Sequence, residues 1–232
     1  DSQSKLYQWV AVLTGSKNAL KGVGFFIGGF LLTHIGFQGA VAAMAGALAL
    51  VWLVSLVLLK KDLGKSSYKP KFKDMLSKSG PINLLSAARL FLFGARDVWF
   101  VVALPVFLSS QLQWDFWQTG GFLASWVIGY GIVQSIAPFL LRIKTAAAPT
   151  GSSALIWAMV LALVTAGLAI ALSSHLPITT VLISGLILFG IVFAINSSLH
   201  SYLIVSYAKD DGVSLDVGFY YMSNALGRLI GT

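Results

Sequence analysis

The chain has 232 residues, of which 57% are hydrophobic and only 10% charged, and it contains no cysteine. This composition excludes an ordinary soluble domain, because several apolar runs reach the ~20 residues that span a bilayer. The missing cysteines exclude disulfides, cysteine-ligated zinc and a thiol nucleophile. Sixteen Lys and Arg outnumber eight acids, an excess that could suggest nucleic-acid binding in a soluble protein. Here the basic residues lie in the loops between apolar runs and inside those runs, which argues against it. We therefore expect a membrane protein whose partner is the lipid bilayer and not nucleic acid.

Hydropathy predicts an all-α polytopic protein with six complete transmembrane helices and part of a seventh. In chain order, the predicted helices cover residues 6–34, 39–59, 82–108, 116–141, 154–172, 178–207 and 217 to the end. The chain begins without Met and stops at Gly231-Thr232 inside an apolar helix. We expect it to be a fragment of a longer protein, truncated at both ends.

The loops between these helices alternate in charge. Residues 60–81, 142–153 and 208–216 carry Lys or Arg, whereas the loops between them carry none. The positive-inside rule places the basic loops in the cytoplasm, which indicates a multi-pass protein of the inner (plasma) membrane.

The long basic loop divides the helices into two groups, a layout that resembles the major facilitator superfamily. On this resemblance, residues 1–59 are the end of the N-terminal bundle, with helices 5 and 6 of the family fold. Residues 60–81 are the cytoplasmic central loop, and residues 82–232 are a truncated C-terminal bundle, with helices 7 to a partial 11.

Five cations lie inside the apolar helices, where each costs roughly 2.5–3.5 kcal/mol at a helix centre unless a wet cavity, a partner or an anion offsets it. Lys17 and Lys21 are four residues apart, so both ammonium groups occupy one helix face. The same helix carries small residues that permit close helix approach. They are Gly15, Gly22, Gly24, Gly28 and Gly29.

Arg89 and Arg96 are seven residues apart, which is two turns, and so they also face one way. Their planar forks suit phosphate and carboxylate oxygens. The neighbouring Asp97 either pairs with another helix or serves as a protonatable site. In the last helix, Asn224 and Arg228 share a face beside a GxxxG motif, which favours helix packing. The alternative role of each cation is a structural ion pair or, near a helix end, contact with the membrane surface.

Asn196 and His200 share a face of helix 178–207 and form either a polar lining, a proton relay or hydrogen bonds to a neighbouring helix. Catalytic patterns are absent from the sequence. It has no Glu or Cys, three His, and no HExxH, P-loop or GxSxG motif. We therefore expect neither an enzyme nor a metal or cofactor site.

Five strings resemble the organoarsenical efflux permeases of the ArsJ type, and together they extend over essentially the whole chain. They are LTGSKNALKGVGFFIGG, INLLSAARLFLFGARDVWFVVALPVF, WVIGYGIVQSIAP, FAINSSLHSYLIVSY and GFYYMSNALGRLIGT. The resemblance implies export of 1-arseno-3-phosphoglycerate, a small anion made by a partner glyceraldehyde-3-phosphate dehydrogenase from arsenate and glyceraldehyde 3-phosphate. Such export confers arsenate resistance.

The implied polyanion suits the pattern of cations. Our hypothesis is that one central cavity binds the polyanion, and that rocking of the two bundles moves it outward by alternating access. The expected substrate-binding residues are Lys17, Lys21, Arg89, Arg96, Arg228, Asn196 and Asn224. Asp97 and His200 are the candidates for proton coupling. Two alternatives stay open: a major facilitator transporter of another organic or phosphorylated anion, and a non-transporting membrane scaffold in which protein acids pair with the cations.

Overall fold

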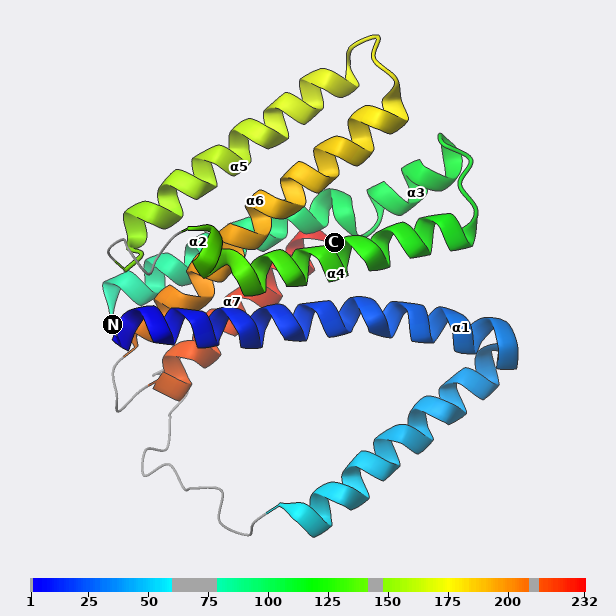
Figure 1. The fold of residues 1–232 in the computed structure, drawn as a ribbon, viewed down its shortest axis with the longest axis horizontal. Helices are drawn as coiled ribbons and strands as arrows, with labels where there is room; N and C mark the ends of the chain where they lie inside the picture. Colours follow the sequence, from blue (N-terminus) through cyan, green and yellow to red (C-terminus); the bar gives the residue numbers. More distant parts are fainter. Residues whose placement is uncertain (1, 60–78, 142–147, 209–212) are drawn as a thin grey trace.

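The computed structural model describes residues 2–59, 79–141, 148–208 and 213–232, and within these ranges it contains helices and no strand (Figure 1). The helices are α1 (Ser2–Leu58), α2 (Gly80–Phe100), α3 (Ala103–Ser110), α4 (Phe116–Leu140), α5 (Gly151–Leu172), α6 (Ile178–Tyr207) and α7 (Val213–Gly231). The predicted all-α class is confirmed for the described part of the chain.

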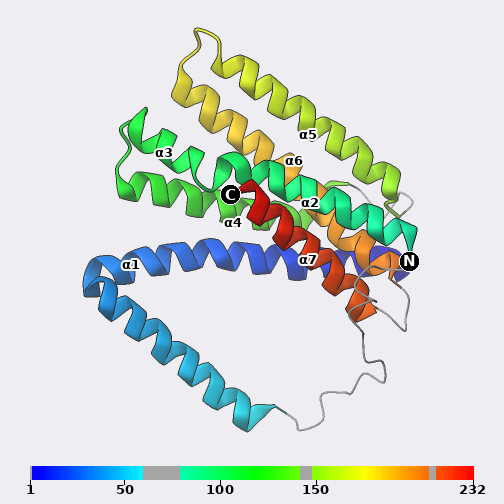
Figure 2. The ribbon, with the colours of Figure 1, turned by 180° about the vertical axis from the view of Figure 1, so that it is seen from behind.

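Helix α1 consists of two arms that meet at Gly36, where the backbone has φ 67° and ψ 179°. This left-handed conformation favours glycine, which has no Cβ to clash. The arms match the predicted helices 6–34 and 39–59. The first arm packs on the helical body, whereas the second points away from it (Figures 1 and 2), and residues 41–58 are exposed except for a half-buried Ser55.

The predicted span 82–108 corresponds to the apolar segment Gly80–Ser110, but a break divides this segment into two helices, because α2 ends at Phe100 and α3 begins at Ala103. Pro105 explains the break. It has no backbone N–H to donate to the carbonyl of Val101, and its ring clashes with that carbonyl in a continuous helix. Helix α7 begins at Val213, earlier than predicted, while α4, α5 and α6 agree with their predicted ranges to within a few residues.

Five of the described helical segments are long and apolar enough to cross a membrane. They are Gln3–Leu58, Gly80–Ser110, Phe116–Leu140, Gly151–Leu172 and Ile178–Tyr207. Because the first of these contains both arms of α1, and because α7 is less apolar, the number of six complete spans and part of a seventh stays a prediction.

Glycines bring the first arm of α1 against α4. A Cβ on Gly22 would lie 2.6 Å from Ile128 Cγ1 and 2.7 Å from the carbonyl oxygen of Ala124, and one on Gly15 would collide with the Ser135 side chain. On α4, Gly131 meets the α1 backbone in the same way. The predicted close approach is thus confirmed for Gly15 and Gly22. Space is open instead at Gly24 and Gly28.

The GxxxG motif of α7 packs on α2. A Cβ on Gly227 would collide with the backbone of Leu90, and one on Gly231 with the backbone of Gly94. Gly94 faces Gly227 in return, where an added Cβ would lie 2.9 Å from its carbonyl oxygen. The predicted packing role of these glycines is confirmed, and it fixes Arg228 beside the α2 helix.

Helix α6 forms the centre of the helical body and contacts α1, α2, α4, α5 and α7. Every residue from Val192 to Ile204 is buried, including the polar stretch that contains Asn196 and His200. This burial explains why so polar a segment lies in a membrane helix: its side chains meet other helices and not lipid.

Candidate substrate-binding site

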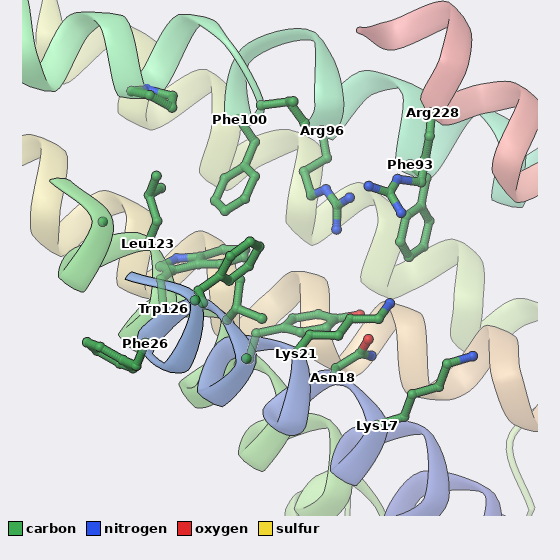
Figure 3. Close-up of a pocket in the computed structure, with 18 of the residues that line it drawn as sticks. Lys17, Asn18, Lys21, Phe26, Phe93, Arg96, Phe100, Leu123, Trp126 and Arg228 are labelled. Carbon is green, nitrogen blue, oxygen red and sulfur yellow. The ribbon is translucent and has the colours of Figure 1, made fainter. Parts of the chain in front are cut away.

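A cavity of about 830 Å³ opens between the first arm of α1 and the α2, α4 and α7 helices (Figure 3). All five intramembrane cations line it, namely Lys17, Lys21, Arg89, Arg96 and Arg228, and so does Asn224. Two faces carry the charges. We call Lys17 and Lys21 of α1 the lysine wall, and Arg89, Arg96 and Arg228 with Asp97 the arginine wall.

The lysine wall is exposed and has no acidic partner within the described residues. The Lys17 Nζ atom lies 5.6 Å from the ring centre of Tyr221, a distance that permits a cation–π contact. Between the two lysines in sequence, the Asn18 amide donates to Gln134 Oε1 at 2.6 Å. The helix face predicted from the spacing therefore borders the cavity, and its ammonium groups are free to meet a ligand.

Arg89 is the deepest cation of the arginine wall, with only 5% of its surface exposed. Its Nη1 donates to Ser197 Oγ at 3.0 Å, and its guanidinium carbon lies 3.9 Å from the ring centre of Phe93 and 5.2 Å from that of Tyr220. No carboxylate in the described part of the chain pairs with it, and its Nε has no hydrogen-bond partner there. A buried guanidinium in this state is stabilised strongly by an anion.

Arg96 and Arg228 share one carboxylate, that of Asp97. Arg96 Nε donates to Asp97 Oδ1 at 2.6 Å, and Arg228 Nε donates to Asp97 Oδ2 at 2.7 Å. The Asp97 side chain is fully buried, and these are the only two salt-bridged pairs in the described residues. The pairing alternative for Asp97 is therefore observed, and it joins α2 to α7.

Aromatic rings surround the Arg96 guanidinium. Its central carbon lies 4.8 Å from the ring centre of Phe93, 5.2 Å from that of Phe193 and 5.7 Å from that of Phe100. These contacts stabilise the cation without cancelling its charge. They also bring apolar ring faces next to the charged part of the cavity.

A chain of hydrogen bonds connects the two walls. Asn18 of α1 bonds to Gln134 of α4, the Gln134 Nε2 atom donates to Ser197 Oγ at 3.4 Å, and the same oxygen accepts from Arg89. Asn18 and Gln134 are not among the residues that the sequence predicts for the site. Two signals point to them: Asn18 lies between the two lysines, and Gln134 is the one amide in the apolar string WVIGYGIVQSIAP.

Two predicted site residues do not reach the cavity. Asn196 is buried and donates to the carbonyl oxygens of Trp157 at 2.7 Å and Val192 at 3.3 Å, so it faces α5. His200 is 4% exposed and is absent from the cavity lining. Spacing on a helix shows which residues share a face but not which neighbour that face meets. The substrate-binding role of Asn196 and the coupling role of His200 gain no support from their positions.

A family model described as Major Facilitator Superfamily matches residues 3–232. The chain belongs to the Major Facilitator Superfamily. It is therefore a multi-pass membrane protein and a membrane transporter. Comparison with curated proteins and with solved structures gives no match.

All of the Lys and Arg residues in the three basic loops, on which the topology prediction depends, lie outside the described residues, which omit 60–78, 142–147 and 209–212. The cytoplasmic position of the central loop and the domain boundaries at 59 and 82 stay predictions. Within the described residues, no three His, Asp or Glu side chains are grouped as metal ligands.

Proposed function

We propose that this transporter exports a small organic anion through the cavity between the two walls, and that its substrate is the organoarsenical anion 1-arseno-3-phosphoglycerate. The observation that carries the proposal is Arg89, a buried guanidinium that borders the cavity and has no carboxylate partner in the described chain. The choice of this anion comes from the family resemblance of the sequence.

The charge balance supports an anionic substrate. Five cations line the cavity, and among the described residues one acid, Asp97, forms ion pairs with them, joining two of the five. Lys17, Lys21 and Arg89 keep their charge available. Charges of one sign in a low-dielectric cleft raise the local concentration of counter-ions. An anion with two or more charged groups can meet both walls at once.

The proposal assigns the first arm of α1 to helix 5 of the family fold and the second arm to helix 6, both in the N-terminal bundle. Helices α2 to α7 then correspond to helices 7 to 11, with α2 and α3 together forming helix 7. The lysine and arginine walls belong to different bundles in this assignment, so rocking of the bundles changes access to the substrate. The protein lies in the inner membrane with residues 60–81 in the cytoplasm, where the partner dehydrogenase supplies substrate.

A non-transporting scaffold accounts less well for the site. It requires protein acids to pair with the cations of the membrane helices, yet Lys17, Lys21 and Arg89 have no acidic partner within the described ranges. A transporter of a different phosphorylated anion uses the same cations, and only transport measurements separate it from the arsenical exporter.

Uptake into everted membrane vesicles tests the proposal. Vesicles that contain the full-length protein receive arsenate alone, or arsenate with glyceraldehyde 3-phosphate, NAD⁺ and the dehydrogenase. We expect arsenic to accumulate only with the complete mixture and to be lost in Arg89→Gln vesicles with equal protein content. Equal accumulation in both mixtures would exclude ester export, while competition by other phosphorylated anions would favour the alternative substrate.

A further inference from the structure

The cavity continues beyond the cations into an apolar compartment. Its lining comes from α1, α2 and α4, and we call it the aromatic compartment: Phe26, Phe100, Phe116, Trp117, Leu123 and Trp126. Figure 3 shows the two parts side by side, with Lys17, Lys21 and Arg228 toward one end and Phe26, Leu123 and Trp126 toward the other. Arg96 lies between them.

The innermost ring of this compartment is held in place by the fold. Trp126 is 8% exposed, and its Nε1 donates to the carbonyl oxygen of Leu186 at 2.8 Å. A Cβ on Gly190 would lie 3.0 Å from that nitrogen, so α6 fits closely against the indole. The ring centres of Phe100 and Tyr130 lie 4.7 Å and 5.9 Å from that of Trp126, and Tyr130 is nearly parallel to it, at 4°. Such a preformed apolar wall binds a ligand without first being ordered.

The α1 side of the compartment leaves room for a ligand. Gly24 and Gly28 of α1 line the cavity, and a Cβ added to either would meet no heavy atom within 4 Å. Side chains at these positions would reduce the space beside Phe26. The total volume of about 830 Å³ lies toward the upper end of the ~300–1,000 Å³ typical of sites for drug-sized ligands. A three-carbon polyanion fills only a small part of it.

We propose that the aromatic compartment binds the flat apolar group of a second substrate class, aryl anions, whose charged group lies at Arg96, Arg89 and Lys21. The inference rests on the proposed function in one respect, that the cations bind the charged group of a substrate. It goes beyond it in the chemistry of that substrate, because a phosphorylated three-carbon acid has no apolar group to place against Phe100 and Trp126.

The test compares two ligands with the same charged group, phenylphosphonate and methylphosphonate, titrated into the purified full-length protein. We expect phenylphosphonate to bind about tenfold more tightly or better, because only it buries a ring. Phe26→Ala and Phe100→Ala should each reduce this preference, which is the ratio of the two affinities, several-fold. Phe91→Ala is the matched control, since Phe91 is 72% exposed on α2 and lies outside the cavity lining.

Equal affinity for the two phosphonates would overturn the inference while leaving the anion site intact. A preference that survives both Phe26→Ala and Phe100→Ala would overturn it as well, since the ring would then bind elsewhere. Failure of both phosphonates to bind the wild-type protein would overturn the inference together with the proposed function, because the cations would then not form an anion site.

Discussion

The lysine wall and the arginine wall face the same cavity, but they hold their charges in different ways. The arginine wall spans two helices joined by glycine contacts, and the buried Asp97 carboxylate pairs with two of its three cations. The lysine wall lies on one helix, is exposed and has no acid beside it among the described residues. The first arrangement builds the fold, whereas the second leaves charge available to a ligand.

Arg89 combines features of both walls. Like Asp97 it is buried, and like the lysines it has no oppositely charged partner in the described ranges. Burial without a carboxylate costs free energy in the empty protein. An anion bound there recovers part of that cost. We therefore expect Arg89 to contribute more than any other cation of the cavity to the binding free energy of the anion.

Asp97→Asn should give the largest effect, on stability. It leaves two guanidinium groups without their shared carboxylate, and breaking a buried ion pair costs about 3–5 kcal/mol. The loss in the free energy of unfolding is measured by unfolding the purified protein in detergent with heat or denaturant. Lys21→Gln is the matched control in the other wall and should change stability by less than about 1 kcal/mol. Equal stabilities of the two variants would show that the ion pairs of the arginine wall stabilise the fold no more than the unpaired lysines do.

Arg89→Gln should give the largest effect on transport. We expect kcat/KM to fall about 100-fold, since truncating a buried charge that pairs with a ligand costs roughly 2–5 kcal/mol. The folded protein should be as stable as the wild type or more so, because an unpaired buried cation is removed. Transport kinetics and unfolding are measured on the same preparations. A variant that loses stability but keeps its transport rate per folded molecule would place Arg89 with the structural cations.

Lys21→Gln should raise KM for the anion about tenfold, or about 1.4 kcal/mol, with little change in kcat. An exposed lysine adds attraction that is partly screened by water and salt. Lys5→Gln is the control, because Lys5 is exposed on the same helix but does not line the cavity. If both substitutions raise KM equally, the effect comes from general surface charge and not from the lysine wall.

The smallest effect should come from Asn18→Ala, which cuts the hydrogen-bond chain between the walls. Loss of one hydrogen bond of this kind costs about 1 kcal/mol, or roughly fivefold in affinity. Substrate titration measures it, and Gln134→Ala in the same background should add little, because both substitutions break one chain. Fully additive losses would show that Asn18 and Gln134 act separately.

Much of the fold follows from the sequence because its elements depend on local patterns. Apolar run length predicts α4, α5 and α6, and the small residues around Gly227 predict a close helix contact. Hydropathy windows do not predict the break before α3, because they average over the single proline, Pro105, that explains it. The bend at Gly36 matches the gap between two predicted helices.

The site follows from the sequence only in part. Cations stand out because charge is costly in a membrane helix, and so the spacing of Lys17 and Lys21, and of Arg89 and Arg96, predicted two faces that line the cavity. The sequence predicts Asn196 in the same site, yet the face that carries it meets α5. The ion-pair partners of Asp97 depend on contacts between helices that are distant in the sequence. No local sequence pattern specifies such contacts.

The central claim is that this cavity binds an anion between its walls. The most direct test is whether an anion protects an introduced cysteine from labelling. The chain has no cysteine, so Thr14→Cys, at a position that lines the cavity, gives one reactive site there. The rate of labelling by a charged thiol reagent is measured with 3-phosphoglycerate, or with glycerol as the neutral control. We predict several-fold slower labelling with 3-phosphoglycerate, no change with glycerol, and loss of the protection when Arg89→Gln is added. An unchanged labelling rate in the presence of 3-phosphoglycerate would contradict the claim.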